Sequence, residues 1–296
     1  MIVRSVGLVH LRRWLTNGPS WNATLVRQLR DLTGAPVVEC KKALESCNGE
    51  LDAAKALLIS YGERIMQKKG QRSTNSGFIA LAVSPDQRRG AMLELRSETD
   101  FVHQLPVVQR LGQRGLELLL NEGVVDHQNL IWKVQDELQS AITRTDENIT
   151  IQRSVCLQIP DTCSSGRVYS YLHNHARVGV LLGLSAPSPC GRQVAMHIAA
   201  MRPQYVSSAD IEPSVLRRIQ LGSHTSASDA RAEVNVQKPS KNESKARLET
   251  YFAEHCLLDQ ALITDAADER YRGQPRSIRE ALGPDVSVFA FERFAL

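Results

Sequence analysis

His173 and His175 are the two residues whose spacing comes closest to that of a metal site. They flank Asn174 in a polar stretch between two apolar runs, so both imidazoles could reach one ion. Protein zinc sites use three or four ligands, and no third ligand with a recognisable spacing accompanies this pair. We therefore favour a polar turn at this place over a metal site.

His197 lies inside the apolar run VAMHIAAM, where two roles are open. A lone histidine in such a run is more often a core or edge residue with satisfied hydrogen bonds than a catalytic base. The phosphate-binding patterns GxxxxGKS/T and GxGxxG do not occur in the chain. Because no nucleophiles, bases and metal ligands are grouped in the sequence, we expect no enzymatic chemistry, no metal and no cofactor.

The stretch SETDFV, which begins at Ser97, presents the bulky Phe101 directly after an acid, Asp100. One interpretation is local: Ser97 or Thr99 caps a helix, and Phe101 folds back as an apolar staple. The other interpretation leaves Asp100 and Phe101 in a loop, because Pro106 is a natural first-turn residue of a helix that starts later.

The elements that must position these residues begin with a small helical module. Between residues 23 and 62, apolar residues recur three times at the three- and four-residue spacing of helices, and Gly62 ends the third pattern. A module of about 40 residues is close to the lower limit for independent folding. Its apolar positions are Leu25, Val26, Leu29, Leu32, Val37, Cys40, Ala43, Leu44, Leu51, Ala54, Leu57 and Leu58.

Two later stretches, 77–95 and 166–184, alternate apolar residues at period two on both sides of a polar turn, which predicts two β-hairpins. Further strands are expected at 149–159 and 285–294, and helical periodicity follows each hairpin. The predicted fold class is α+β, with a small N-terminal three-helix module followed by two α+β subdomains with antiparallel sheets.

The N-terminal residues have a composition of their own. No acid precedes Asp31, and Arg4, Arg12 and Arg13 alternate with apolar residues. This pattern is typical of an amphipathic mitochondrial transit peptide, although a basic first helix of the mature protein is the alternative. The expected divisions are a transit peptide at 1–22, the three-helix module at 23–62, a basic linker at 63–76, and subdomains at 77–187 and 188–296.

The overall composition excludes some classes of function. A net charge of +4 is small for 296 residues, so a surface built for nucleic acid is not expected. No run approaches the roughly 20 apolar residues that span a bilayer. The six cysteines contain no CxxC pair, which is typical of reduced thiols rather than of a disulfide framework.

Several blocks, in order along residues 24 to 294, resemble the elongation factor Ts family, whose members are guanine nucleotide exchange factors for elongation factor Tu. The module resembles the family's N-terminal module, which has a ubiquitin-associated type of fold, and ETDFV resembles its most diagnostic motif. The blocks are LVRQLRDLTGAPVVECKKALESCNGELDAAKALL, ETDFV, DENITIQR, HARVGVLL, RQVAMHIAAMRPQYVS and RLETYFAEHCLLDQ.

The resemblance implies a site for the partner GTPase. Thr99, Asp100, Phe101 and Val102 match the motif that enters the GTPase domain near its nucleotide magnesium site. Secondary contacts are implied for Arg30, Val37, Val38, Val178, Gly179 and His197. The implied partner is mitochondrial elongation factor Tu, in a 1:1 heterodimer in the mitochondrial matrix, without direct contact to nucleic acid or membrane.

Departures from the family pattern favour its mitochondrial branch. The stretch at about 213–240 is too short and too polar for the antiparallel coiled coil of the bacterial members, so a reduced coiled-coil insertion is expected there in the second subdomain. No C-terminal helical extension follows the last strand. Arg96-Ser97 replaces a common Asn-Cys, and Val37-Val38 stands where Met is frequent.

Two other classes compete with this assignment. The module at 24–62 could belong to an adaptor that binds a ubiquitin-like surface, which would leave ETDFV without a role. The basic residues at 64–72 could bind RNA, but they lack the aromatic side chains on which bases stack.

Overall fold

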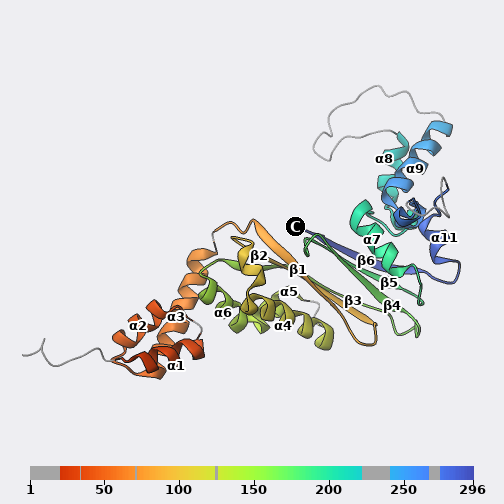
Figure 1. Cartoon of the computed structure of the whole chain (residues 1–296). Coiled ribbons are helices and arrows are strands. Elements are labelled where there is room, and N and C mark those ends of the chain that lie inside the picture. The colour runs from red at the N-terminus through yellow and green to blue at the C-terminus, as the bar shows by residue number, and fades with distance from the viewer. Residues whose placement is uncertain (1–20, 34, 71, 124–125, 222–240, 267–273) are drawn as a thin grey trace, which may run out of the picture. The chain divides into compact units, whose positions relative to one another are not determined.

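The computed structural model describes residues 21–33, 35–70, 72–123, 126–221, 241–266 and 274–296 (Figure 1). The chain divides into two compact units. The first contains residues 1–77, 96–114 and 131–151, and the second contains residues 78–95, 115–130 and 152–296. Residues on both sides of the boundary expected at 187/188 therefore belong to the second unit. Apart from Trp21 and Asn22, the transit peptide predicted at 1–22 lies outside the described residues.

The first unit begins with the predicted three-helix module. Its helices are α1 (Ala23–Thr33), α2 (Val37–Ser46) and α3 (Leu51–Lys69). Asn22 caps α1, because its Oδ1 accepts the backbone N–H of Leu25 at 2.8 Å. The helices enclose an apolar core of Val26, Leu29, Ala35, Cys40, Ala43, Leu44, Ala54 and Leu58.

The third helix is longer than the sequence pattern predicts. The pattern ends it at Gly62, but α3 continues to Lys69, so half of the linker expected at 63–76 is helical. A glycine inside a helix costs only about 1 kcal/mol relative to alanine, and the residues after Gly62 are mostly strong helix formers. Three of the predicted apolar positions of the module are also exposed, Leu32 at 57%, Leu57 at 41% and Val37 at 37%.

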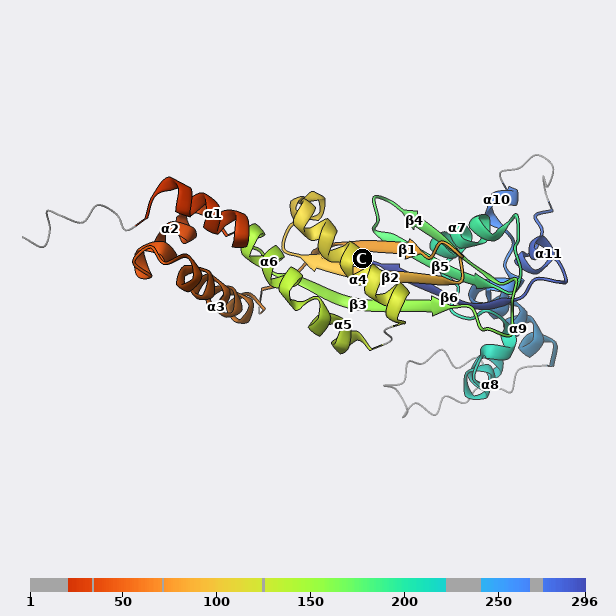
Figure 2. The same ribbon diagram turned by 90° about the horizontal axis from the view of Figure 1, so that it is seen from below.

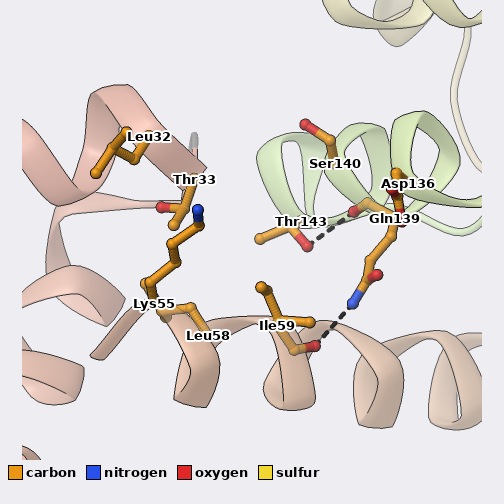
Figure 3. A pocket seen from close by; sticks show the side chains of 9 residues that line it. All are labelled: Leu32, Thr33, Lys55, Leu58, Ile59, Asp136, Gln139, Ser140 and Thr143. Atoms are coloured by element: carbon orange, nitrogen blue, oxygen red, sulfur yellow. Dashed lines mark hydrogen bonds between the residues drawn. The ribbon is translucent and has the colours of Figure 1, made fainter. Parts of the chain in front are cut away.

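The module packs against α6 (Gln135–Thr145) within the same unit. Gln139 Nε2 of α6 donates a hydrogen bond to the backbone oxygen of Ile59 in α3 at 2.7 Å (Figure 3). α6 therefore holds the module, in addition to the chain connection. Beside this bond lies an open groove of about 390 Å³, lined by Leu32, Thr33, Lys55, Leu58, Ile59, Asp136, Gln139, Ser140 and Thr143.

Helices also fill the connection between the second and third strands. A one-turn 3-10 helix, η2 (Phe101–Gln104), precedes α4 (Pro106–Glu122), which begins at the predicted proline, and α5 (His127–Lys133) follows. Gly115 lets α4 approach the sheet closely, since a Cβ atom at this position would lie 2.6 Å from Leu93 Cδ1.

The strands of the described residues form two three-stranded antiparallel sheets, and the predicted α+β class is confirmed. Both predicted hairpins are present, and in the second hairpin Arg167 pairs with Leu184. The first sheet has the order β1-β2-β3, with β1 (Ser76–Val83), β2 (Arg89–Ser97) and β3 (Ile149–Gln158). The second has the order β4-β5-β6, with β4 (Arg167–His173), β5 (Val178–Leu184) and β6 (Val288–Ala295).

The tip of the second hairpin is the predicted polar turn. Asn174, His175 and Ala176 have φ angles of 51°, 51° and 64° in the left-handed region. Within the part of the chain that the structure describes, no three His, Cys, Asp or Glu side chains gather as metal ligands. In the same residues, no helix combines the length and the apolar character needed to cross a bilayer.

The second unit has a core on each face of the second sheet. On one face, Val180 and Leu182 of β5 pack against Val194 and Ile198 of α7 (Gly191–Met201). On the other face, Leu181 packs in a cluster with Ile79, Met92, Ile159, Val168 and Phe294, which come from both sheets. Figure 2 shows the strands from below.

The rest of the second unit is helical before β6. α8 and α9 pack against each other. Most of the insertion expected at 213–240 lies outside the described residues, and only its first part, α8, is described. The elements are η3 (Ser208–Asp210), α8 (Pro213–Leu221), α9 (Lys241–His255), η4 (Leu257–Asp259), α10 (Ile263–Ala266) and α11 (Ile278–Leu282).

Candidate partner-binding site

Phe101 is an aromatic side chain almost entirely in solvent. Its exposure is 82%, whereas the next residue, Val102, is 4% exposed and anchors the turn in the core. Burying a phenylalanine side chain stabilises a protein by roughly 1.5 to 3 kcal/mol. Because Phe101 is exposed, the protein without a partner does not gain this stabilisation. The interpretation of Phe101 as a folded-back apolar staple is therefore wrong.

Hydrogen bonds hold the turn that carries Phe101. Ser97 Oγ donates to the backbone oxygen of Thr99 at 2.6 Å, so the hydroxyl has no further proton to give. His103 Nε2 lies 2.7 Å from the same oxygen and must donate to it. Ser97, which is buried, thus joins the start of the turn to its end.

Glu147 binds the same turn from the segment before β3. Its Oε2 accepts the backbone N–H of Thr99 at 2.9 Å, and its Oε1 accepts the Thr99 hydroxyl at 2.5 Å. The sequence block DENITIQR contains Glu147 without indicating this contact, because only the fold brings the block beside ETDFV. Asp100, between Thr99 and Phe101, is exposed.

The residues expected as secondary contacts on the module are on its surface. Arg30 is exposed on α1, and Val37 and Val38 at the start of α2 are 37% and 59% exposed. Leu57 on α3 adds another exposed aliphatic side chain. These side chains are free to contact a partner.

Val178, Gly179 and His197 have a different environment in the second unit. Gly179 is buried, and Val178 packs partly against the cluster beneath α7. His197 is fully buried. Its Nε2 lies 2.8 Å from Gln260 Oε1, and its Nδ1 accepts the backbone N–H of Ile263 at 3.2 Å.

The His197 ring is therefore neutral, with its proton on Nε2, because an amide oxygen needs a donor and a backbone N–H needs an acceptor. Burial lowers the pKa of His197, since it disfavours the charged imidazolium. His197 is a core residue with satisfied hydrogen bonds. In this conformation its ring presents no surface to solvent.

A tryptophan is also exposed where the sequence does not predict it. Trp132 of α5 is 72% exposed. Its position in the helical pattern next to Ile131 and Val134 does not separate it from core residues, so the sequence carries no signal for its exposure.

The α+β fold thus carries a hydrogen-bonded turn that presents an exposed phenylalanine. Residues 98–270 match the model of the family described as Elongation factor TS. The chain belongs to the elongation factor Ts family.

Whole-chain similarity agrees with this assignment. The chain is 32% identical over 292 residues to elongation factor Ts of Aquifex aeolicus (strain VF5), covering 92% of this chain and 96% of that protein. It is 31% identical over 293 residues to elongation factor Ts of Rhodospirillum centenum (strain ATCC 51521 / SW), covering 93% and 92%. Identity to elongation factor Ts of Hamiltonella defensa is 36% over 198 residues, covering 67% of each chain.

Proposed function

We propose that the protein promotes release of GDP from elongation factor Tu and that Phe101 is the residue on which release depends. The observation that carries this proposal is the 82% exposure of Phe101 on a hydrogen-bonded turn. GDP is held largely through its phosphates and a Mg²⁺ ion. A side chain that enters beside this site and shifts the ligating elements weakens the binding of both.

The neighbours of Phe101 share this role in the proposal. Asp100 is exposed beside the ring and adds a negative charge near the metal site of the partner. Thr99 and Val102 fix the turn from either side. The protein itself performs no chemistry, because lowering the affinity of GDP is a binding effect.

Thermodynamic reciprocity sets the order of events. If the factor lowers the affinity of elongation factor Tu for nucleotide, then bound nucleotide lowers the affinity for the factor by the same ratio. Exchange then proceeds through a transient ternary complex, and incoming GTP expels the factor. A 1:1 heterodimer is sufficient for this cycle.

The three-helix module adds a second attachment point through Arg30, Val37 and Val38. Two linked contacts strengthen binding more than either one alone, because the second forms at a high effective concentration. In the second unit, Val178, Gly179 and His197 support the partner contact by shaping β5 and α7. Packing of α3 on α6 favours this arrangement over a free tether.

The proposed location is the mitochondrial matrix. The acid-free, arginine-rich composition of residues 1–22 supports it, as does the polar composition of 213–240. Import of a fluorescent fusion into isolated mitochondria, with and without residues 1–22, tests the location. Import of the truncated fusion would place the signal elsewhere in the chain.

Release of a fluorescent GDP analogue from mitochondrial elongation factor Tu, with and without the protein, tests the function. We expect the wild type to accelerate release and Phe101→Ala to lose most of the acceleration. Phe289→Ala is the matched control, since Phe289 is 37% exposed on β6 and outside the proposed site. A wild-type protein that leaves the release rate unchanged contradicts the proposal.

A further inference from the structure

We infer that Glu147 is a positioning residue for nucleotide exchange, because its carboxylate fixes the turn that presents Phe101. The inference rests on the proposed function. Glu147 is not among the residues that the family resemblance implies as partner contacts. It acts through Thr99 rather than by touching the partner.

The contact uses both carboxylate oxygens on one residue. Oε2 accepts the Thr99 backbone N–H at 2.9 Å, and Oε1 accepts the Thr99 hydroxyl at 2.5 Å. Hydrogen bonds to an ionised acceptor are about twice as strong as neutral ones, and a two-point contact also fixes orientation. We call this pair of bonds the Thr99–Glu147 clasp.

A reciprocal bond runs beside the clasp. Glu98 Oε1 accepts the backbone N–H of Asn148 at 2.7 Å, so each of the two segments supplies a carboxylate to a backbone amide of the other. Asn148 Nδ2 in turn donates to the backbone oxygen of Arg72 at 3.0 Å. The segments that carry Thr99 and Glu147 are therefore held in one register.

The end of α6 holds Glu147 in place. Asp146 closes the helix in the left-handed region, with φ 59°, and its N–H donates to the Ile142 oxygen. Aspartate tolerates this conformation better than most residues. The N–H of Glu147 then donates to Thr145 Oγ1 at 3.3 Å, so the carboxylate projects from an ordered helix terminus.

Phe101 is consequently fixed on both sides. The clasp holds Thr99, two residues before it, and the buried Val102 follows it directly. Only the side-chain torsions of Phe101 remain to be ordered in a complex. An anchor whose backbone is already in place loses less freedom on binding, which raises affinity without any new contact.

The resemblance implies that Thr99 contacts the partner, whereas the clasp gives Thr99 a role within the turn. Its hydroxyl is engaged by Glu147, so Thr99 serves the turn and leaves the partner contact to Asp100 and Phe101. Serine at this position would keep both bonds of the clasp, whereas valine would keep only the backbone bond. These two substitutions separate the clasp from the size of the side chain.

The first test is amide hydrogen exchange of the full-length chain without a partner. Glu147→Ala should speed exchange at the Thr99 amide roughly 10- to 100-fold, as expected for loss of a hydrogen bond to a charged group. Asp285→Ala is the control, because it removes an exposed carboxylate that is distant in sequence from the turn. This variant should leave exchange at the Thr99 amide unchanged. An unchanged Thr99 amide in Glu147→Ala overturns the inference.

The second test is the rate of GDP release from elongation factor Tu. Glu147→Ala should slow release at least several-fold, and it should add nothing further in a Phe101→Ala background, because residues that act as one unit are not additive. Equal losses in both backgrounds, or a wild-type rate in Glu147→Ala, overturn the inference. Thr99→Val should resemble Glu147→Ala in direction, and Thr99→Ser should keep the wild-type rate.

Two results separate this inference from the proposed function. Normal release with Phe101→Ala overturns the proposed function and the inference with it. Slow release with Phe101→Ala but wild-type release with Glu147→Ala overturns the inference alone. Should Glu147→Ala fail to fold, Thr99→Val decides the matter, since it removes only one hydroxyl bond from the turn.

Discussion

Ser97 Oγ and His103 Nε2 lie 2.7 Å apart, and this hydrogen bond closes the turn on whose outer side Phe101 is exposed. The serine hydroxyl donates to the Thr99 oxygen and accepts from the histidine. Ser97 at the end of β2 is thus joined to His103 in the 3-10 helix η2, which precedes α4. The position of Phe101 depends on polar bonds beneath it rather than on packing of its own ring.

Ser97→Ala should destabilise the protein by about 1 to 2 kcal/mol, because it removes the hydroxyl that accepts from His103 and donates to the Thr99 oxygen. Exchange activity should fall as the turn loosens. Urea unfolding and GDP release measure the two effects. Ser97→Thr, which retains a hydroxyl, is the control, and a fully stable Ser97→Ala protein would show that the bond is dispensable.

Phe101→Ala should leave the free energy of unfolding within about 0.5 kcal/mol of the wild type, because the ring is exposed in the free chain. Truncation of a buried aromatic anchor in a complex commonly costs about 2 to 4 kcal/mol, so exchange should fall sharply. Asp100→Ala should act in the same direction but less strongly. A large loss of thermal stability in Phe101→Ala is the contrary outcome.

Because His197 is buried, we expect the free energy of unfolding of the protein to depend on pH. Burial lowers its pKa in the folded state below the ordinary value of 6.5, so the unfolded chain binds a proton more readily. The contribution of neutral His197 to stability is complete above pH 6.5. It is lost as the pH falls from 6.5 through the lowered pKa of the folded state. Urea unfolding at several pH values between 7.5 and 5, compared with His197→Gln, should show a steeper loss in the wild type. Parallel curves would exclude His197 as the source.

Gly179→Ala should destabilise the second unit by about 1 to 3 kcal/mol through overpacking. A Cβ atom at Gly179 would lie 2.7 Å from both Ile79 Cγ2 and Met92 Sδ. Gly183 in the same strand is the matched control, since its nearest neighbour would lie 3.3 Å away. Thermal unfolding compares the two variants, and an equal shift for both would contradict this account.

Val38→Asp should weaken binding of elongation factor Tu without changing stability, because Val38 is 59% exposed on α2. At saturating concentration the rate of GDP release should stay close to that of the wild type, as expected of an auxiliary contact. Leu32→Asp introduces the same charge at a residue that is 57% exposed on α1. Titration of the release rate measures both variants, and equal weakening by Leu32→Asp would remove the special role of α2.

The sequence by itself determined the elements with strong local signals. Period-two alternation predicted both hairpins, helical spacing predicted the module, and Pro106 marked the start of α4, because each signal depends on neighbours along the chain. The end of α3 was missed for the same reason: Gly62 is a weak helix breaker, and packing of α3 on α6 lies outside any local pattern. The ETDFV motif pointed to the site but left two interpretations of Phe101 open.

Only the tertiary structure decided between them. It exposed Phe101, buried His197 between Gln260 and Ile263, and brought the carboxylate of Glu147 to Thr99, which is 48 residues away in sequence. Hydrogen bonds between distant segments leave no periodic trace in a sequence, since one donor and one acceptor suffice. Burial likewise depends on what the other elements cover, and the fold settles that for each side chain.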